Sequence, residues 1–455
     1  MKKRNLSLWA VLFWLLVWQA GSMALHSDIL LVSPLRVLQT LLALIQTTRF
    51  WSSLLGSMGR ILGGFLLAAA LGTLLAALAA RFKRVAELLA PLVLAMKTVP
   101  VASFIILALI WFGSRNLSVF IALVMVFPVM YTNVLSGIRA RDDSLLEMAR
   151  VFKIPALRRI RCIDLPQVMP YFRAGCTLGL GLCWKAGVAA EVIGMPVPSI
   201  GYRPAEAFGG QYALPGKDIF GNTGAVCVDA GHRSDERRLR KAVYGGARRA
   251  GKEADAAVIA IHKLCKAFDN KAVLRDFSCT MEDGCVTALM APSGAGKTTL
   301  LRMLMGLEMA DSGEISGLSG RRISAVFQED RLLENMNPVD NIRLTAPKLD
   351  RAVILREMAA MGLTDCENQP ARELSGGMRR RVAILRALLC GADVIFLDEP
   401  FKGLDEATKA LVVAETKRLC AGKTVLLVTH EEKEAAMMGA EQVVRMEMDV
   451  KNTSV

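Results

Sequence analysis

The sequence predicts a multi-domain protein in which an all-α membrane domain precedes an α/β domain. Long apolar runs fill the first two hundred residues and raise the apolar fraction of the 455-residue chain to 53% and its mean hydropathy to +0.37. From Val258 onward, short apolar runs alternate with helical patterns, an order typical of a parallel sheet covered by helices on both faces. We therefore expect a membrane domain over 1–220, a basic, disordered linker over 221–257 and an α/β domain over 258–455.

Five segments have the length and apolarity of membrane helices, which need about 20 residues. They are Leu6–Leu25, Ile61–Ala80, Leu92–Phe112, Leu117–Ile138 and Phe172–Ile193. Small residues crowd the second and fifth segments, which favours close packing between helices. The basic start at Lys2–Arg4 and the apolar run after it resemble a signal peptide. No clear cleavage site follows, so we expect a first membrane helix with its N-terminus inside the cell.

The net charge of +14 admits two interpretations, nucleic-acid binding and membrane association. The Lys and Arg residues of the first half stand in short loops beside apolar segments, which is the positive-inside pattern. We find no DNA- or RNA-binding module, and therefore expect the lipid bilayer, and no nucleic acid, as a partner. The ten cysteines are scattered and form no Cys-x-x-Cys pair, so we expect buried, reduced thiols.

A glycine-rich segment follows the expected strand Val286–Met290 and opens a helical pattern. It matches the Walker A phosphate loop, with Ala291 in place of the first glycine. Small residues let backbone N–H groups turn inward around the phosphates. We expect Lys297 to reach the β- and γ-phosphates of ATP and the Thr298 hydroxyl to bind Mg²⁺. The expected nucleotide-binding residues of the loop are Ser293, Gly294, Ala295, Gly296, Lys297, Thr298 and Thr299.

A second apolar strand, Val394–Leu397, ends in two carboxylates, Asp398 and Glu399. A buried strand does not end in two acids unless cationic partners compensate them. We expect Asp398 to hold the Mg²⁺ shell, and Glu399 to orient or deprotonate the attacking water. Further buried strands are expected at Ser324–Phe327 and Thr424–Val428.

Leu374–Met378 resembles the signature sequence of ATP-binding cassette proteins, with Met378 at the usual glutamine. The resemblance implies that the signature of one subunit covers the γ-phosphate bound by the other, in an α/β P-loop ATPase domain of ATP-binding cassette type. A serine and two glycines that open a helix also make an anion cradle by their own chemistry. We therefore expect Ser375, Gly376 and Gly377 to contact nucleotide.

The remaining elements of this family occur in the expected order. Phe268 stands where an aromatic side chain stacks on adenine. Gln328 matches the glutamine that contacts nucleotide and Mg²⁺, and His430 matches the switch histidine, which the resemblance implies is catalytic with Glu399. Gly403–Asp405 matches the D-loop, although Lys402-Gly403 departs from the usual small pair.

The first half resembles a permease. Glu147 begins a helical stretch, near 145–166, that is similar to the EAA loop of binding-protein-dependent importers, with Lys153 at the usual glycine. Both halves together are similar to the nitrate, sulfonate, taurine and bicarbonate uptake family, with the permease half fused to its ATPase half. The resemblance implies that the loop docks on the ATPase and transmits its motion. From charge, we expect a basic group on the loop to meet an acidic group after Gln328: Arg158, Arg159 and Arg161 against Glu329, Asp330 and Glu334.

The expected function is ATP-driven import of a small anionic solute across the cell (inner) membrane, by a multi-pass protein with a cytoplasmic ATPase domain. One chain supplies one of each half, so a second copy of the chain or equivalent subunits are expected, with an extracytoplasmic solute-binding protein. ATP and Mg²⁺ are the expected cofactors. Lys185, within the fifth segment, is expected to favour an anion in the pathway, to snorkel or to have a structural partner.

An alternative function is that of an active ATPase on a defective membrane anchor that does not transport. Permeases of this family end with a sixth helix, but the apolar pattern here stops at Gly221. Five crossings from an inside N-terminus would leave the ATPase outside the cell. The codons for 221–233 can encode apolar residues in one shifted frame. A shift of reading frame near Phe220 would therefore account for the missing helix, and also for the fusion if the ATPase gene lies immediately downstream in the shifted frame. A genuine fusion is the other interpretation.

Overall fold

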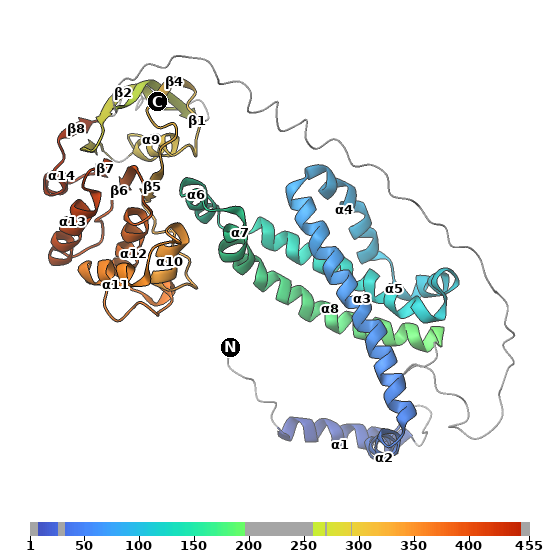
Figure 1. Ribbon diagram of the computed structural model, residues 1–455. Helices are drawn as coiled ribbons and strands as arrows, with labels where there is room; N and C mark the ends of the chain where they lie inside the picture. Colours follow the sequence, from blue (N-terminus) through green and yellow to red (C-terminus); the bar gives the residue numbers. More distant parts are fainter. Residues whose placement is uncertain (1–7, 26–31, 196–257, 269–270, 293, 447–455) are drawn as a thin grey trace. The chain divides into compact units, whose positions relative to one another are not determined.

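The computed structural model describes residues 8–25, 32–195, 258–268, 271–292 and 294–446 (Figure 1). These residues fall into two compact units. One holds the helices that precede Arg141 and the long helix that follows Pro166, and the other combines Asp142–Pro166 with the α/β residues. The expected linker at 221–257 and the reading-frame interpretation near Phe220 lie outside the described residues.

The first unit is helical. Its helices are α1 (Leu8–Leu25), α2 (Pro34–Ile45), α3 (Thr48–Arg81), α4 (Lys83–Thr98), α5 (Val101–Arg139) and α8 (Leu165–Gly194). Small residues bring the long helices together. A Cβ atom at Gly64 of α3 would lie 2.6 Å from the carbonyl oxygen of Val119 on α5, and one at Gly187 of α8 would lie 2.7 Å from Cγ1 of Ile61 on α3. The expected close packing through small residues is confirmed.

Four of the five expected membrane segments fall on single helices, α1, α3, α5 and α8. The expected segment Leu92–Phe112 is instead divided, because α4 ends at Thr98 and α5 begins at Val101. Pro100 between them has no N–H group with which to continue α4. A second interruption follows within α5, where Gly113 has a φ of 67°. The short apolar helix α2 is an addition to the expected segments.

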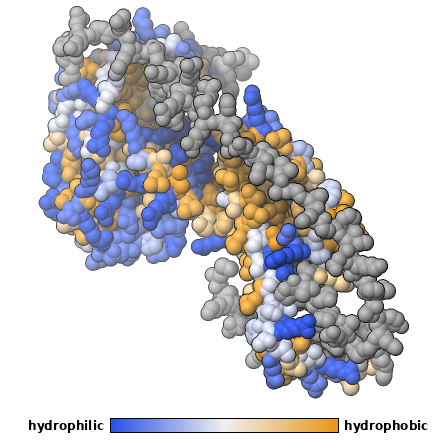
Figure 2. All heavy atoms as spheres, turned by 45° about the vertical axis from the view of Figure 1, so that its right-hand side comes forward, coloured by the Kyte–Doolittle hydropathy of each residue, from blue (hydrophilic) through white to orange (hydrophobic). Residues whose placement is uncertain are grey.

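The helical unit keeps much of its apolar surface exposed. Among the described residues, three helical stretches are long and apolar enough to cross a membrane: Thr48–Arg81, Phe104–Arg139 and Ala156–Gly194. Leu66 on α3 and Ile110 on α5 are 65% and 74% exposed. Figure 2 shows hydrophobic side chains gathered over the helical unit, whereas the visible face of the α/β unit is mostly hydrophilic. Exposed apolar surface of this extent is typical of contact with lipid.

A buried ion pair joins α3 to α8. Glu191 of α8 accepts hydrogen bonds from Arg60 Nε at 3.0 Å and from the Ser57 hydroxyl, both on α3. Lys185 is exposed on α8. Lys185 and Glu191 are six residues apart and so lie on different faces of α8, and Glu191 pairs with Arg60.

The second unit contains two sheets. The larger has five parallel strands in the order β5-β6-β7-β3-β8, with bounds β3 Val286–Met290, β5 Ile323–Val326, β6 Val394–Asp398, β7 Thr424–Thr429 and β8 Gln442–Arg445. The four buried strands expected from the sequence are confirmed, each within one residue of its expected bounds. A smaller antiparallel sheet, β2-β1-β4, is made by β1 (Val258–Phe268), β2 (Lys271–Glu282) and β4 (Ser312–Ser316), and was not expected.

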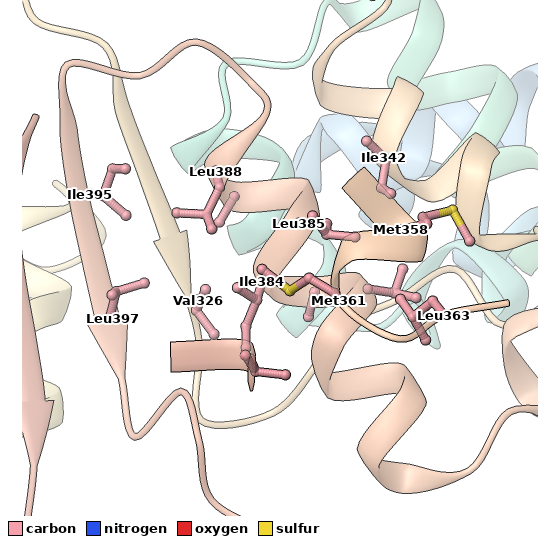
Figure 3. Packing of buried hydrophobic residues seen from close by; sticks show 14 of the residues in the cluster. Val326, Ile342, Met358, Met361, Leu363, Ile384, Leu385, Leu388, Ile395 and Leu397 are labelled. Atoms are coloured by element: carbon pink, nitrogen blue, oxygen red, sulfur yellow. The ribbon is translucent and has the colours of Figure 1, made fainter. Parts of the chain in front are cut away.

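Helices complete the α/β unit. They are α9 (Lys297–Leu304), α10 (Pro338–Thr345), α11 (Arg351–Ala360), the 3₁₀ turn η3 (Ala371–Glu373), α12 (Gly376–Leu388), α13 (Glu406–Cys420) and α14 (Glu432–Met438). Figure 3 shows how α12 packs on the sheet: Ile384 and Leu388 lie on the side of Val326 of β5 and of Ile395 and Leu397 of β6, and Leu385 lies toward Met358. The nine cysteines of the described residues are free thiols; Cys183, Cys366 and Cys420 are buried as expected, and the other six are half-buried.

A short helical segment between α5 and α8 packs into this same unit. It consists of α6 (Asp143–Val151), α7 (Ala156–Arg159) and the π-helical turn η1 (Ile160–Asp164). Asp142 caps α6 by accepting a hydrogen bond from Ser144 N at 2.8 Å. Leu145, Met148 and Ile163 are buried in one apolar cluster with residues of the α/β sheet. Burial of these side chains anchors the segment, which we call the docked loop (residues 142–166).

Candidate functional site

The phosphate loop forms the turn between β3 and α9. Gly294 and Gly296 have φ values of 86° and 87°, a backbone conformation that L side chains adopt only with strain. A Cβ atom at Gly294 would meet nothing within 4 Å, so there is space above this peptide, whereas one at Gly296 would lie 3.0 Å from the Val273 carbonyl oxygen. The space and the start of α9 suit an anion such as a phosphate. Ala291 is buried where the first glycine was expected.

Lys297 is the first residue of α9 and is buried. Its Nζ donates to the carbonyl oxygens of Ala291 at 2.6 Å and Pro292 at 3.4 Å, and lies 2.9 Å from His430 Nε2. Burial lowers the pKa of Lys297, which Glu399 and Asp398 partly oppose. The ammonium therefore spans the phosphate loop and gains from an anion placed there. Thr298 is exposed, Thr299 is half-buried, and Ser293 lies outside the described residues.

The two expected carboxylates lie at the end of strand β6: Asp398 is its last residue and Glu399 follows it. Asp398 is buried, and burial together with the neighbouring Glu399 raises its pKa to about 6, against the opposing charges of Arg380 and Lys297. Such a carboxylate favours an added cation. Oxygen donors of Asp398, Thr298 and Gln328 are the ligand type that Mg²⁺ prefers. Among the described residues, no group of three or more His, Cys, Asp and Glu side chains could hold a metal by itself.

Glu399 is fixed in an unusual conformation. Its φ is 45°, a left-handed value that is strained for a residue with a side chain. Its Oε1 lies 2.9 Å from His430 Nε2 and its Oε2 lies 2.8 Å from Lys402 Nζ. Burial raises the pKa of Glu399, but the hydrogen bond and charge of Lys402 outweigh burial and the pKa is lowered. Glu399 is therefore ionised near neutral pH and able to orient a water molecule or to accept a proton.

His430 thus contacts both Lys297 and Glu399, so residues from three expected motifs meet in one site. Phe268 is 44% exposed at the end of β1, where Lys266 Nζ lies 5.1 Å from the centroid of its ring. Gln328 is exposed after β5, and His430 is exposed after β7. An exposed aromatic face and an exposed amide are available to a ligand.

The signature segment opens α12. Ser375 caps this helix by accepting a hydrogen bond from Met378 N at 3.3 Å. Ser375 and Gly376 are exposed, Gly377 is half-buried, and a Cβ atom at Gly376 would meet nothing within 4 Å. The N-terminal end of α12 is therefore exposed, and its backbone N–H groups are accessible to an anion or to another subunit.

Arg380 was missed by sequence reasoning. Its buried guanidinium donates to the carbonyl oxygens of Phe327, Asp398, Glu399 and Pro400 at 2.6 to 2.9 Å, and to Asp330 Oδ1 at 3.3 Å. It thereby joins the signature helix to the ends of β5 and β6. The sequence did contain a feature that predicts burial of Arg380. It stands four residues before Ile384, on the apolar face of α12, and a buried cation needs several hydrogen-bond acceptors.

The docked loop meets the α/β unit through charges as well as apolar contacts. Glu147 Oε1 accepts from Arg302 at 2.7 Å and Glu147 Oε2 accepts from Arg331 at 3.0 Å. Arg331 also donates to the Ser144 carbonyl oxygen at 3.3 Å, and Arg158 of the loop donates to that of Leu344 at 3.3 Å. Burial raises the pKa of Glu147, but the hydrogen bonds and charges of Arg302 and Arg331 outweigh it and lower the pKa.

The polarity expected for this contact is wrong. The loop supplies the acid and the α/β unit supplies the two arginines. Arg159 pairs within the loop, with Asp164 at 3.3 Å, and Asp330 is engaged by Arg380 at 3.3 Å. The net charge of each segment was a poor guide because these acids and bases have partners nearer in the fold. Lys153 has a φ of 48°, which explains why glycine is usual at this position.

Comparison with known proteins identifies both halves. Residues 52–213 match the model of the binding-protein-dependent transport system inner membrane component, and residues 274–402 match that of the ABC transporter. The chain is 42% identical to an aliphatic sulfonates import ATP-binding protein of Rhodococcus jostii, over 38% of this chain and 72% of that relative. This chain belongs to the ABC transporter family.

Other relatives of this ABC transporter include a second protein with a sulfonate name and one with a polyamine name. An aliphatic sulfonates import ATP-binding protein of Cupriavidus necator is 35% identical over 44% of this chain and 69% of its own length. A spermidine/putrescine import ATP-binding protein of Mycoplasma capricolum is 33% identical, and the chain spans 58% of its length. Among solved structures, a dimeric bacterial ABC transporter cassette is 24% identical over 42% of this chain and 94% of that one, with a TM-score of 0.38.

The ABC transporter combines the permease and the ATPase of an import system in one chain. Its α/β unit is an ATP-binding cassette that hydrolyses ATP in support of transport, and its helical unit associates with the membrane.

Lys297→Ala is expected to weaken ATP binding by about tenfold or more, because a hydrogen bond to a charged group contributes about 1.5–3 kcal/mol. The variant removes the ammonium that spans the phosphate loop between Ala291 and His430. Titration of the full chain in detergent with a fluorescent ATP analogue measures the change. Lys433→Ala, at an exposed position on α14, is the control and should bind as the wild type does. Equal affinity of Lys297→Ala and the control would contradict the assignment.

Proposed function

We propose that this ABC transporter imports a small anionic solute, of the nitrate, sulfonate, taurine and bicarbonate class, in a process driven by ATP hydrolysis. The observation that carries the proposal is the position of Glu147. This residue belongs to the loop between permease helices α5 and α8, and is held by Arg302 and Arg331 of the ATPase at 2.7 and 3.0 Å. A loop fixed in this way can pass movement of the ATPase to the two helices that it joins.

The choice of an anion is supported by the relatives. The sulfonate-named relative has the higher identity, 42% against 33%, and the larger covered share, 72% against 58%, than the polyamine-named one. A sulfonate is an anion and spermidine is a polycation, so the two substrate classes require opposite charges in the pathway. Lys185, exposed on α8, is a cationic group that could line such a pathway.

In the proposed reaction, Lys297 holds the phosphates and Glu399 orients or deprotonates the water. His430, 2.9 Å from Glu399 Oε1, positions that carboxylate. The residues proposed to bind nucleotide are Phe268, Ser293, Gly294, Ala295, Gly296, Lys297, Thr298, Thr299, Gln328, Ser375, Gly376, Gly377 and Asp398. Thr298, Gln328 and Asp398 are proposed to hold Mg²⁺, which would neutralise the negative charge that develops on the phosphates.

The proposed assembly has two permease halves and two ATPase halves, from two copies of the chain or from equivalent subunits. An extracytoplasmic solute-binding protein delivers the solute to it. The membrane domain spans 1–220, the basic linker 221–257 and the ATPase domain 258–455. The protein lies in the inner membrane and its ATPase domain is cytoplasmic, where ATP is abundant.

Reconstitution of the full chain in liposomes tests this function. The vesicles contain ATP, and the medium contains a solute-binding protein of the import system with either a labelled alkanesulfonate or labelled spermidine. We expect ATP-dependent uptake of the sulfonate alone. Uptake of spermidine alone would overturn the anionic class. Hydrolysis without uptake, and without a response to the binding protein, would indicate an ATPase on a defective membrane anchor.

Ser375→Arg is expected to abolish hydrolysis and to leave ATP binding within about threefold of the wild type. Its side chain fills the exposed cradle at the start of α12, which we propose serves the nucleotide of the second copy, whereas Lys297 binds nucleotide in the same chain. Hydrolysis and fluorescent-nucleotide binding of the full chain separate the two effects. A wild-type rate per chain that does not change when the protein is diluted to a monomer would contradict the shared site.

A further inference from the structure

A completely buried arginine lies between the signature helix and the docked loop. Arg386 of α12 is 0% exposed. Its guanidinium nitrogens donate to the backbone carbonyl oxygens of Asp330 at 2.8 Å and Arg331 at 2.6 Å. Its Nε has no hydrogen-bond partner among the described residues, and burial lowers the pKa of the group to about 10. A buried cation held by neutral acceptors is costly, so its position calls for an explanation other than stability.

The first connection from Arg386 to the docked loop runs through Arg331. The backbone of Arg331 is held by Arg386, and its φ of 47° is a strained left-handed value. Its side chain stacks 4.0 Å from the centroid of the Phe327 ring and reaches Glu147 and the Ser144 carbonyl oxygen. Arg386 therefore fixes the peptide from which the main charged contact to the loop projects.

The second connection is direct. The guanidinium of Arg386 lies 5.6 Å from the centroid of the Phe152 ring, at the end of α6. An arginine over an aromatic face is attracted to the π electrons, and the attraction grows where water is excluded.

A third connection runs through α10. Thr345 donates to the Arg386 carbonyl oxygen at 3.1 Å, and the carbonyl oxygen of the adjacent Leu344 accepts from Arg158 of the loop.

We propose that Arg386 is a positioning residue that links the signature helix α12 to the docked loop, so that nucleotide-dependent movement of α12 reaches residues 144–152. The inference rests on the proposed coupling of ATP hydrolysis to transport. Arg386 is completely buried, and its contacts described above are with residues other than those proposed to bind nucleotide. It acts by holding Asp330 and Arg331 to α12 while its guanidinium contacts Phe152.

Amide hydrogen exchange of the full chain in detergent tests the link without a transported solute. Exchange is measured with and without a non-hydrolysable ATP analogue in two segments, 144–152 of the loop and 294–304 of the phosphate loop and α9. In the wild type, both segments should respond. In Arg386→Met, 294–304 should respond as before, and the response of 144–152 should fall at least about fivefold, the lower range of coupling between sites.

Two further variants keep the test decisive. Arg381→Met is the matched control, because Arg381 lies on the same helix and donates to the Met361 and Gly362 carbonyl oxygens at 2.9 and 3.0 Å; its loop response should equal that of the wild type. Phe152→Leu leaves Arg386 and its two carbonyl partners in place, and should also reduce the loop response. This variant decides the matter if Arg386→Met does not fold.

The outcomes separate this link from the proposed function. Loss of the 144–152 response in Arg386→Met or Phe152→Leu, with a normal control, supports the link even if no solute is transported. A wild-type response of 144–152 in these variants overturns it, as does a wild-type chain in which 144–152 ignores the nucleotide. Where transport is measurable, the same variants should lower the stimulation of hydrolysis by the binding protein by a similar factor and leave the KM for ATP unchanged.

Discussion

Glu399→Gln is expected to reduce ATP hydrolysis by at least about a hundredfold, the lower range of general-base catalysis, and to leave ATP binding nearly unchanged. Lys297, Thr298 and Asp398 hold the nucleotide and its metal in our proposal, and Glu399 takes no part in that binding. Glutamine has the same shape and retains an oxygen for Lys402 and His430. Glutamine cannot accept the proton of the attacking water. ATP hydrolysis is therefore lost, whereas the nucleotide-binding site remains intact.

The measurement is a single-turnover hydrolysis assay beside a nucleotide-binding titration, both on the full chain. Glu406→Gln is a suitable control, because Glu406 lies in the first turn of α13 and its side chain is 95% exposed. The control should hydrolyse ATP at the wild-type rate. If Glu399→Gln hydrolyses ATP as the control does, a different group is the base, and the strained φ of 45° at Glu399 needs another reason.

The nucleotide site was largely predictable because its motifs are local. The Walker A phosphate loop needs only a strand, a glycine-rich turn and a helix in succession, and β3 and α9 supply these at the expected residues. The two carboxylates after β6 follow from an apolar run that ends in acids. Parallel strands bring their carboxyl ends to one edge of a sheet, so Glu399 after β6 and His430 after β7 meet there.

Contacts between distant segments were not predictable in this way. Arg380 belongs to the basic run Arg379–Arg381, and Arg386 is a lone cation in an apolar stretch of α12. Both are buried, with backbone carbonyl groups from far along the chain as their acceptors. The antiparallel sheet β2-β1-β4 was not predicted because its strands lack an uninterrupted apolar run. The pairing is also irregular, with shifts of register along β1. Gly113 and Pro100 interrupt an apolar pattern that by itself suggests continuous helix.

The ion pairs between the docked loop and the α/β unit were not predictable from the sequence either. Basic residues of 145–166 and acidic residues after Gln328 suggested one attraction, and the fold uses the opposite one at Glu147. Charge counts do not reveal which groups are already paired. Arg159 with Asp164, and Asp330 with Arg380, are satisfied within their own neighbourhoods. Arg302 and Arg331 of the α/β unit hold Glu147 of the loop between them.

Glu147→Arg is expected to abolish the stimulation of ATP hydrolysis by the solute-binding protein, and solute uptake with it, while basal hydrolysis persists. The variant places a third guanidinium against Arg302 and Arg331 in a partly buried position. Removal of one partner from a hydrogen-bonded charge pair costs about 2 kcal/mol or more, and reversal of its charge adds repulsion, so the affinity of the loop for its site should fall by at least about tenfold. Basal hydrolysis persists because Glu147 makes no contact with Lys297, Glu399 or His430.

The ionisation of Glu147 sets the pH range in which this contact operates. Its folded-state pKa is lowered from the ordinary 4.5, so the contact contributes its full stability above that value and loses it as the pH falls through the lowered pKa. Assays between about pH 6 and 8 therefore compare fully ionised wild type with the variants. Over this range, stimulation by the binding protein should show no titration that belongs to Glu147.

Two variants complete the test of Glu147. Arg150→Glu reverses an exposed charge on the same helix, α6, and should keep wild-type stimulation. Combining Glu147→Arg with Arg302→Glu restores one pair of opposite charges at the position of the 2.7 Å contact, and should recover part of the stimulation. Glu147→Arg with normal stimulation and normal uptake would show that the buried side chains of Leu145, Met148 and Ile163 hold the loop without the ion pairs. Loss of stimulation with no recovery in the charge-reversed pair would locate the defect in Arg331, which still faces the introduced cation.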